Sequence, residues 1–193
     1  MTYTRAEIQR LAKKGFELAM TRGKQLCCVD KANVLESSRL WRETVQAMEK
    51  EYPEVTVSYE FVDAVAMRLV QWPNSYDVMI TENLFGDILT DEASVISGSM
   101  GLMPSASVGE TTRLYEPIHG SYPQAAGKDI ANPLATVLSA AMMFEDFGLT
   151  KEAQEIRDVV NKSLAEGVVT EDLAEGGKAF KTSEVGDWLA KNI

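Results

Sequence analysis

Three aspartates stand at positions where carboxylates can bind a divalent cation. Asp87 and Asp91 are four residues apart in a segment with helical periodicity, so their side chains share one helix face, with β-carbons about 5–6 Å apart. Asp63 is the last residue of a predicted strand, at the sheet edge where sites in α/β proteins usually form. Clustered carboxylates repel one another, and Mg²⁺ or Mn²⁺ relieves that repulsion. Spacing alone favours a simpler interpretation, in which Asp63 and Asp87 cap helices and Asp91 is a solvated charge.

Lys31 is a candidate base. It follows a short buried strand in the segment VDKANVLESSRLW, beside Asp30 and Asn33. A lysine at the end of a strand can accept a proton from a substrate or stabilise developing negative charge. Spacing alone favours the alternative, a surface lysine in a turn.

The segment 116–133, EPIHGSYPQAAGKDIANP, has the composition of a ligand-binding loop. Its glycines permit close approach of the backbone to a ligand, and the helix start at Asn132 and Pro133 offers free backbone N–H groups. These features fit a loop that wraps a nucleotide. A long connection with several turns has the same composition, so both interpretations stay open.

Other kinds of site are excluded by residue type and spacing. His119 is the single histidine, which leaves no His-rich zinc site, and no GxGxxG follows a predicted strand. Cys27 and Cys28 are adjacent in a predicted strand, so their side chains point to opposite faces and do not bridge one another. Free cysteines suit a reducing compartment, and with no secretion signal or apolar run of about 20 residues we expect a cytoplasmic protein.

The charge of the chain argues against nucleic-acid and membrane partners. The net charge is −10, and the sequence contains no cluster of basic residues. Nucleic acids and anionic membranes both need a stripe of Lys and Arg to bind to. The 193 residues, 45% of them hydrophobic, suffice for a real core. We therefore expect an ordinary globular chain of one large domain or two small ones.

Strands alternating with helices in the first half of the chain predict an α/β fold. Thr4 and Glu7 form a capping box before the first helix. The stretch 97–131 is punctuated by Gly and Pro with almost no periodicity, so we expect a long loop there. The predicted helices are 5–21, a second one marked by Leu40 to Met48 and stopped by Pro53, 64–71, 87–96, 133–148, 151–166 and 183–191, and the predicted strands are 25–30, 56–63 and 76–81.

Four segments together resemble the 3-isopropylmalate dehydrogenase family, within the metal-dependent β-decarboxylating dehydrogenases that include isocitrate dehydrogenase. They are VDKANVLESSRLWRE, the aspartate after YEFV, TENLFGDILTDEASVISGSMGLMPSAS and YEPIHGSYPQAAGKDIANPLATVLSAAMM, in the family's order and spacing. The resemblance covers nearly the whole chain. It implies the family's three-layer α/β fold and the NAD-dependent oxidative decarboxylation of (2R,3S)-3-isopropylmalate in leucine biosynthesis. NVLE and SRLW favour isopropylmalate; homoisocitrate, tartrate or malate, and isocitrate are the alternative substrates.

The resemblance also implies roles for single residues. Lys31 and Asp63 resemble catalytic residues, and Lys31 and Asn33 resemble residues at the substrate. Asp63, Asp87 and Asp91 resemble the ligands of Mg²⁺ or Mn²⁺. In such enzymes Lys31 and Asp63 serve the partner subunit's site, which implies a homodimer with a shared active site. The residues that resemble the family's loop for the adenosine half of NAD are His119, Gly120, Ser121, Tyr122, Pro123, Gln124 and Asn132.

The cofactor loop departs from the family pattern at two positions. Tyr122 and Gln124 stand where members usually carry Ala and Asp. That Asp would favour the free ribose hydroxyls of NAD, and Gln124 does not replace its charge. No Lys or Arg appears at these positions to favour a 2′-phosphate, so NAD stays ahead of NADP.

The chain is also shorter than members of the family, which implies an incomplete fold, the C-terminal half only. We interpret 1–97 as the later part of the central substrate-binding, metal-binding and dimerisation domain, and 98–193 as the C-terminal part of the cofactor domain. Arg39, Arg42 and Arg68 fall on predicted helices, where we expect solvated positions rather than substrate carboxylate binding. The chain alone is therefore expected to dimerise without oxidising isopropylmalate. The alternatives are an assembly module and a nucleotide-binding protein without chemistry.

Overall fold

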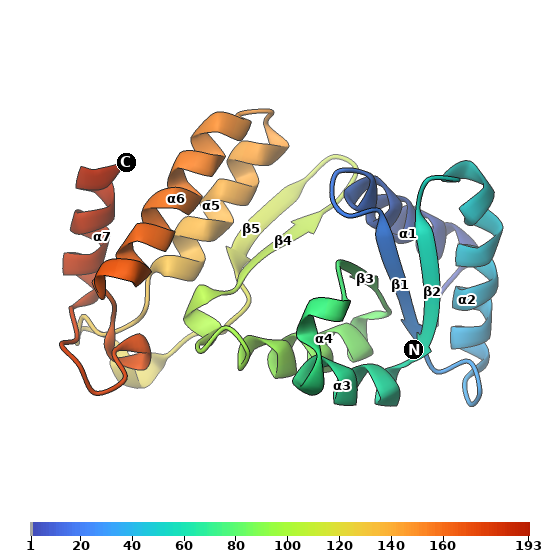
Figure 1. Cartoon of the computed structure of the whole chain (residues 1–193), viewed down its shortest axis with the longest axis horizontal. Coiled ribbons are helices and arrows are strands. Elements are labelled where there is room, and N and C mark those ends of the chain that lie inside the picture. Colours follow the sequence, from blue (N-terminus) through green and yellow to red (C-terminus); the bar gives the residue numbers. More distant parts are fainter. Residues whose placement is uncertain (1) are drawn as a thin grey trace. The chain divides into compact units, whose positions relative to one another are not determined.

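The structure, a computed structural model, describes residues 2–193. The chain divides into two compact units, Met1–Ile96 and Ser97–Ile193. Figure 1 follows both from the blue N-terminal part to the red C-terminal part. That each unit has its own role in cofactor or metal binding stays a prediction.

A three-stranded parallel sheet forms the centre of the first unit. β1 (Gln25–Asp30) lies between β2 (Thr56–Phe61) and β3 (Val78–Ile80), and both neighbours run parallel to it. Parallel neighbours need crossover connections, and helices supply them here. The helices of this unit are α1 (Arg5–Met20), α2 (Glu36–Met48), α3 (Val62–Gln71) and α4 (Asn83–Ser94).

Helices cover both faces of this sheet, which gives the predicted three-layer α/β arrangement (Figure 1). On one face, α1 and α2 contribute Phe16 and Val45 to a core that contains Cys28. On the other face, α3 and α4 contribute Leu89 to a core that contains Cys27. The two cysteines are free, as predicted, and burial raises the pKa of the Cys27 thiol to about 11. Neither residue is therefore a candidate thiolate nucleophile.

The first helix shows how local sequence fixes an element. The hydroxyl of Thr4 accepts a hydrogen bond from the Glu7 backbone N–H at 3.4 Å, and the Glu7 carboxylate accepts one from the Thr4 backbone N–H at 2.7 Å. This is the predicted capping box. Gly15 lets the helix approach the sheet, because a Cβ there would collide with the side chain of Ile80.

The second unit packs three helices and a hairpin. β4 (Pro104–Val108) and β5 (Arg113–Pro117) form an antiparallel pair, and α5 lies against both strands and against α6. Leu134, Val160 and Val185 form the centre of its main core. Its helices are α5 (Leu134–Asp146), α6 (Thr150–Glu166) and α7 (Thr182–Asn192).

The hairpin corrects the prediction of a long loop over 97–131. Its strands are short and lack the alternation of a half-buried sheet, so no period marks them. The register comes instead from the turn, where Gly109 N–H donates to the Thr112 carbonyl at 3.0 Å. Pro104, the first residue of β4, lies opposite Pro117, the last residue of β5, and the pairing ends there.

Two helix starts also differ from the prediction. α3 begins at Val62, so Asp63 lies in the first turn of a helix rather than at the end of a strand. The reason is that β1 ends at Asp30, opposite Phe61, and leaves β2 no further partner. α4 begins at Asn83, four residues before Asp87.

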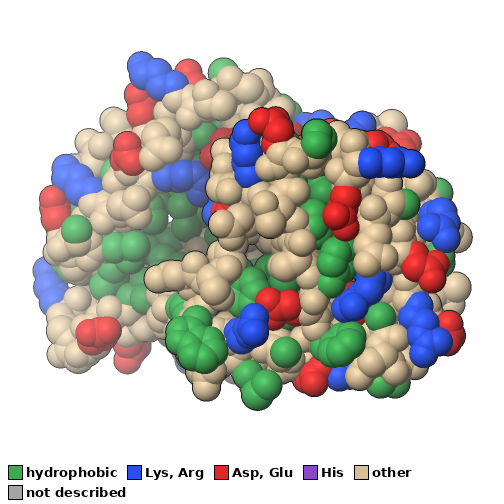
Figure 2. All heavy atoms as spheres, turned by 45° about the vertical axis from the view of Figure 1, so that its right-hand side comes forward, with side chains coloured by type: hydrophobic (Ala, Val, Ile, Leu, Met, Phe, Trp, Pro, Cys, Tyr) green, Lys and Arg blue, Asp and Glu red, His purple; other side chains and the backbone are tan. Residues whose placement is uncertain are grey.

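Charge and apolar surface can be followed on the face drawn in Figure 2. Acidic and basic side chains are interspersed there, with no continuous basic stripe, and hydrophobic groups reach the surface between them. No helix among residues 2–193 has the length and apolar character that crossing a membrane requires.

Candidate functional site

Lys31 and Asp63 meet at the carboxyl edge of the parallel sheet. Lys31 directly follows β1, and Asp63 lies two residues after the neighbouring strand β2. The ends of parallel neighbours lie side by side, so the Lys31 ammonium donates a hydrogen bond to Oδ1 of Asp63. This bond is the main cause that lowers the pKa of Asp63 below its usual range. Two residues that the sequence placed in one site are thus in contact.

The turn that carries Lys31 is held by a buried ion pair that the sequence did not predict. Asp30 is only 1% exposed, and its carboxylate accepts hydrogen bonds from Nε of Arg42 at 2.7 Å, from a terminal nitrogen of Arg42 at 3.0 Å and from the Ala32 N–H at 2.8 Å. The Arg42 guanidinium also lies 5.1 Å from the ring centre of Phe61. The prediction of a solvated Arg42 is therefore wrong, because this side chain binds a buried carboxylate.

Arg42 was recognisable in principle. It follows Trp41, which lies on the buried stripe of α2 with Ser38 and Val45. A basic residue beside that stripe can reach an aspartate that ends an otherwise apolar strand. The expectation for Arg39 holds better, because it is exposed and pairs with Glu36 on its own helix.

Asn33 lies in the tight turn after Lys31. The carbonyl of Lys31 accepts hydrogen bonds from the backbone N–H groups of Val34 and Leu35, both at 2.9 Å. This turn leaves the Asn33 side chain exposed, on the same short segment as Lys31. The structure thus keeps Asn33 in the same turn as Lys31, which bonds to Asp63.

Asp87 and Asp91 lie on α4, one turn apart and both exposed. Within residues 2–193, no three side chains of the His, Cys, Asp or Glu type are grouped so as to hold a metal ion. Asp63 is thus not gathered with Asp87 and Asp91 inside one chain, and its bond is to Lys31. Two carboxylates on one helix face are hard oxygen donors that suit Mg²⁺ or Mn²⁺, with further ligands required from elsewhere.

Glu82 is a second buried acid close to this sheet edge. It is 3% exposed, precedes α4, and its Oε1 lacks a hydrogen-bond partner within the described residues. Burial raises the pKa of its carboxyl group, and the negative charge of Asp30 adds to the rise. The sequence offered one signal for it, an acidic residue two positions after the buried strand β3.

The second unit contains a cavity of about 810 Å³ next to the start of α5. Five of the residues predicted to hold the adenosine half of a dinucleotide line it: His119, Gly120, Ser121, Tyr122 and Asn132. Pro123 and Gln124 belong to a short 3₁₀ turn in the same loop and are not among the lining residues. Glu171 and Asp172 also line the cavity, from a segment that the sequence did not connect with it.

Asp172 joins three segments around this cavity. Its carboxylate accepts hydrogen bonds from the Ser99 hydroxyl, from Nδ2 of Asn132 at 2.9 Å and from the Thr170 hydroxyl at 2.5 Å. Partial burial raises the pKa of Asp172, but these three donors outweigh it and lower the pKa below its usual range. Oδ1 of Asn132 in turn accepts from the Leu134 N–H at 2.9 Å, at the start of α5.

The backbone around Asn132 is fixed on both sides. A Cβ on Gly101 would lie 2.6 Å from the Cβ of Asn132, so only glycine permits this approach. Asp129 adopts a left-handed conformation, with φ of 57°, and its carboxylate accepts from the N–H of Ser183 at 2.9 Å and from its hydroxyl at 2.6 Å. The cavity wall is thus a hydrogen-bonded loop and not a loose connection.

The lining combines small apolar side chains with a few polar groups. Ala125, Ala126 and Ile130 offer an apolar surface for a flat ring, and Asn132 and Ser121 offer polar groups beside it. Such a combination is typical of small-molecule and cofactor sites. The cavity and its chemistry therefore fit the adenosine portion of a nucleotide.

Comparison with known proteins adds names to this geometry. Residues 1–189 match the family model described as isocitrate/isopropylmalate dehydrogenase. A curated 3-isopropylmalate dehydrogenase from Bacteroides fragilis is 59% identical over 192 residues, which cover 99% of this chain and 54% of that protein. The corresponding enzyme of Oceanobacillus iheyensis is 53% identical, with 100% of this chain and 54% of the relative covered. The chain thus spans about half the length of the curated relatives it matches.

A solved structure shows the same fold. The isocitrate dehydrogenase of Methylococcus capsulatus superposes with a TM-score of 0.93 at 35% identity, covering 99% of this chain and 57% of that one.

Proposed function

Because the chain belongs to the isocitrate/isopropylmalate dehydrogenase family, we propose that it serves the NAD-dependent oxidative decarboxylation of (2R,3S)-3-isopropylmalate, a step of leucine biosynthesis. The observation that supports this proposal is the hydrogen bond between Lys31, the candidate base, and Asp63, a candidate metal ligand. The names of the relatives favour isopropylmalate as the substrate. Since those relatives are longer, the activity proposed is that of a complete active site to which this chain contributes.

In this proposal Lys31 accepts the proton of the substrate hydroxyl, and Asn33 contacts the substrate from the same turn. The Asp30–Arg42 ion pair keeps the Lys31 turn in place during this transfer. Asp63, Asp87 and Asp91 hold Mg²⁺ or Mn²⁺, which supplies Lewis acidity when bound. Asp63 connects metal binding with proton transfer, because its carboxylate bonds to Lys31 in this structure.

The cavity of the second unit is proposed to bind the adenosine half of NAD. His119, Gly120, Ser121, Tyr122 and Asn132 line it, and Pro123 and Gln124 support the same wall from the adjoining turn. Asp172 keeps the Asn132 amide in a single orientation through its hydrogen bond. The wall is therefore organised before the nucleotide arrives.

We further propose a homodimer in which Lys31 and Asp63 serve the partner's site. This arrangement is supported by Asp63 lying apart from Asp87 and Asp91 within one chain, as described above. α3 and α4 also expose large apolar side chains that an interface would bury, namely Met67, Val70, Ile88 and, beside these helices, Trp72 and Val95. The two free cysteines support a reducing, cytoplasmic location.

An active chimaera tests this proposal. The part of the Bacteroides fragilis enzyme that has no counterpart here is joined to this chain in the family's order, and reduction of NAD is measured with 3-isopropylmalate and Mn²⁺. We expect turnover that is lost in the Lys31→Ala variant and kept in the Lys151→Ala control, whose residue is exposed on α6. Turnover with isocitrate in place of isopropylmalate would overturn the substrate assignment.

The second candidate is an assembly module without activity, favoured by the same exposed apolar side chains. Turnover of the chimaera that is lost in Lys31→Ala would exclude a module without activity, and a turnover assay with sedimentation analysis of the 193-residue chain alone tests the dimer. A dimer without turnover is expected, because the chain spans about half the length of the curated relatives it matches. A monomer would remove the proposed shared active site.

A further inference from the structure

We propose that Glu171 selects the nucleotide, by accepting the ribose hydroxyls of an adenosine nucleotide and excluding one that carries a 2′-phosphate. This inference rests on the proposed cofactor cavity and names the chemical class that the cavity takes. Position 124 is an uncharged glutamine, so Glu171 supplies the negative charge that distinguishes the two kinds of nucleotide.

Two adjacent acids line the cavity, and they are in different situations. Asp172 accepts three side-chain hydrogen bonds, from Ser99, Asn132 and Thr170. Glu171 has no side-chain hydrogen bond or ion pair with any of residues 2–193, and it is exposed. Asp172 is therefore occupied with holding the wall, while the Glu171 carboxylate is free to meet a ligand.

The other side chains that line the cavity in the described part of the chain offer little positive charge to attract a phosphate. Of the side chains that line the cavity in the described part of the chain, only His119 can carry a positive charge. Nδ1 of His119 already lies 3.0 Å from the Gly120 carbonyl oxygen. No described Lys or Arg is among the lining residues, so a 2′-phosphate would meet a carboxylate without a compensating cation.

The chemistry of the two ligands differs at this point. A carboxylate has two oxygens that can each accept a hydrogen bond, which suits two neighbouring ribose hydroxyls. A 2′-phosphate removes one of these donors and adds close to two negative charges. Like charges in a partly enclosed cavity repel, so we expect adenosine nucleotides with a free 2′-hydroxyl to bind at least about tenfold more tightly.

The backbone of Glu171 is fixed, which makes this effect specific. Glu171 begins a 3₁₀ turn, Glu171–Leu173, in which the Leu173 N–H donates to the carbonyl of Thr170 at 3.1 Å. Thr170 is 1% exposed, and Asp172 is held by its three donors. The Glu171 side chain therefore starts from a well-defined point on the cavity wall.

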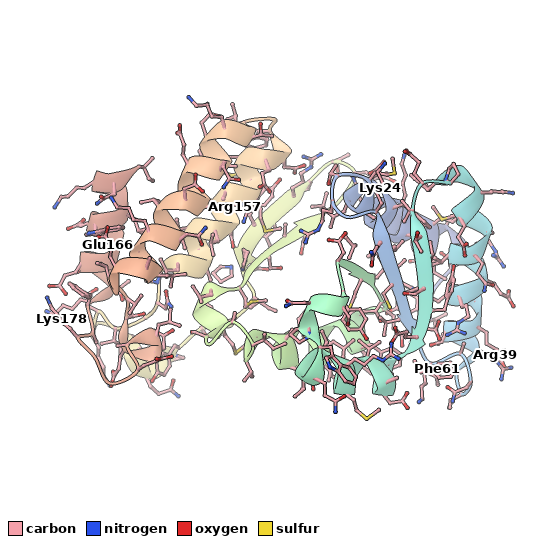
Figure 3. All side chains as sticks on the ribbon, in the orientation of Figure 1. Lys24, Arg39, Phe61, Arg157, Glu166 and Lys178 are labelled. Carbon is pink, nitrogen blue, oxygen red and sulfur yellow. The ribbon has the colours of Figure 1, made fainter. Side chains whose placement is uncertain are left out.

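Binding of two small probes to the 193-residue chain tests the inference by calorimetry. The probes are AMP and adenosine 2′,5′-bisphosphate, which differ only in the 2′-phosphate. We expect unaltered protein to prefer AMP by about tenfold or more, Glu171→Gln to lose most of this preference, and Glu171→Lys to bind the bisphosphate more tightly than AMP. The matched controls are Glu166→Gln and Glu166→Lys, whose residue is exposed at the end of α6 (Figure 3) and is not among the residues that line the cavity.

The outcomes separate this inference from the proposed function. AMP binding with a preference that Glu171→Gln and Glu171→Lys leave unchanged would overturn the role of Glu171 and keep the cofactor cavity. Equal responses to Glu171→Lys and Glu166→Lys would have the same meaning, because net charge alone would explain them. Binding of neither probe, with circular dichroism showing a folded protein, would overturn the cavity itself and the inference with it.

Discussion

The two units hold their candidate sites by different means. In the first, the ends of regular elements bring Lys31 and Asp63 together, and a buried ion pair between Asp30 and Arg42 fixes the turn. In the second, a loop is fixed by hydrogen bonds to one partly exposed carboxylate, Asp172. One buried ion pair is thus enough to fix the turn at the sheet edge, whereas the loop wall depends on several weaker hydrogen bonds. A change in the Asp30–Arg42 ion pair should therefore destabilise the chain more than a change at Asp172.

The largest expected effect comes from removing the anchor of the first unit. Arg42→Met leaves the Asp30 carboxylate buried without its partner, and we expect it to destabilise the chain by about 3–5 kcal/mol. Thermal unfolding measures this loss, and hydrogen exchange should rise in 25–61 before it rises in 98–193. Arg10→Met is the control, because Arg10 is exposed on α1 and should change stability by less than about 0.5 kcal/mol. Equal losses for both variants would show that the pair is no anchor.

A metal-ligand change should act on activity and leave the fold. In the chimaera, Asp87→Asn removes a proposed ligand charge, and we expect Mn²⁺-dependent turnover to fall by more than about 100-fold. The midpoint of thermal unfolding should stay within about 2 °C, because Asp87 is exposed. Asp187→Asn on α7 is the matched control. Full activity of Asp87→Asn at limiting Mn²⁺ would exclude Asp87 as a ligand.

Loss of the Asp172 carboxylate in the second unit should be milder. Asp172→Asn keeps the shape of the side chain but weakens three hydrogen bonds, and after allowing for exposure we expect a loss of about 1 kcal/mol. The folded-state pKa of Asp172 is lowered, so this stability is present above the unfolded pKa of about 3.9 and is lost as pH falls through the folded value. Denaturant unfolding at pH 7 and pH 3 measures it. A difference between the variant and unaltered protein that grows on acidification would contradict the assignment.

The smallest effect is expected at Glu82, with the opposite dependence on pH. Burial raises its folded-state pKa, so the protonated form is the compatible one, and stability is lost as pH rises through that folded value. Glu82→Gln mimics the protonated acid and should stabilise the chain by up to about 1 kcal/mol at pH 8, with almost no effect at pH 4. Stability curves at the two pH values provide the check. A stabilisation that is equal at both would mean that its ionisation is irrelevant.

The sequence predicted the first unit well, because periodicity and caps determine it locally. The strand 25–30 and the helix starting after Thr4 are where the patterns placed them. The patterns also placed Lys31 directly after one strand and Asp63 at the end of another, and the structure pairs these strands. Strands that are linked by helices run parallel, so their carboxyl ends lie side by side once the strands pair.

The residues that were missed depend on contacts that no local pattern records. The hairpin of β4 and β5 lies in a stretch without periodicity. Asp172 reaches Ser99 across 73 positions of the chain, and Arg42 reaches Asp30 across 12. Side-chain hydrogen bonds over such separations emerge only once the elements have packed. Candidate site residues on loops are therefore the hardest to predict from sequence.

The two cysteines lie on opposite faces of one strand, so each thiol can report local opening of the helical layer that covers it. Cys27 lies under α3 and α4, and Cys28 lies under α1 and α2. Neither thiol can react with an alkylating reagent until the helices above it move away from the sheet. The rate at which each cysteine is modified would therefore time the detachment of one helical layer, separately from the other.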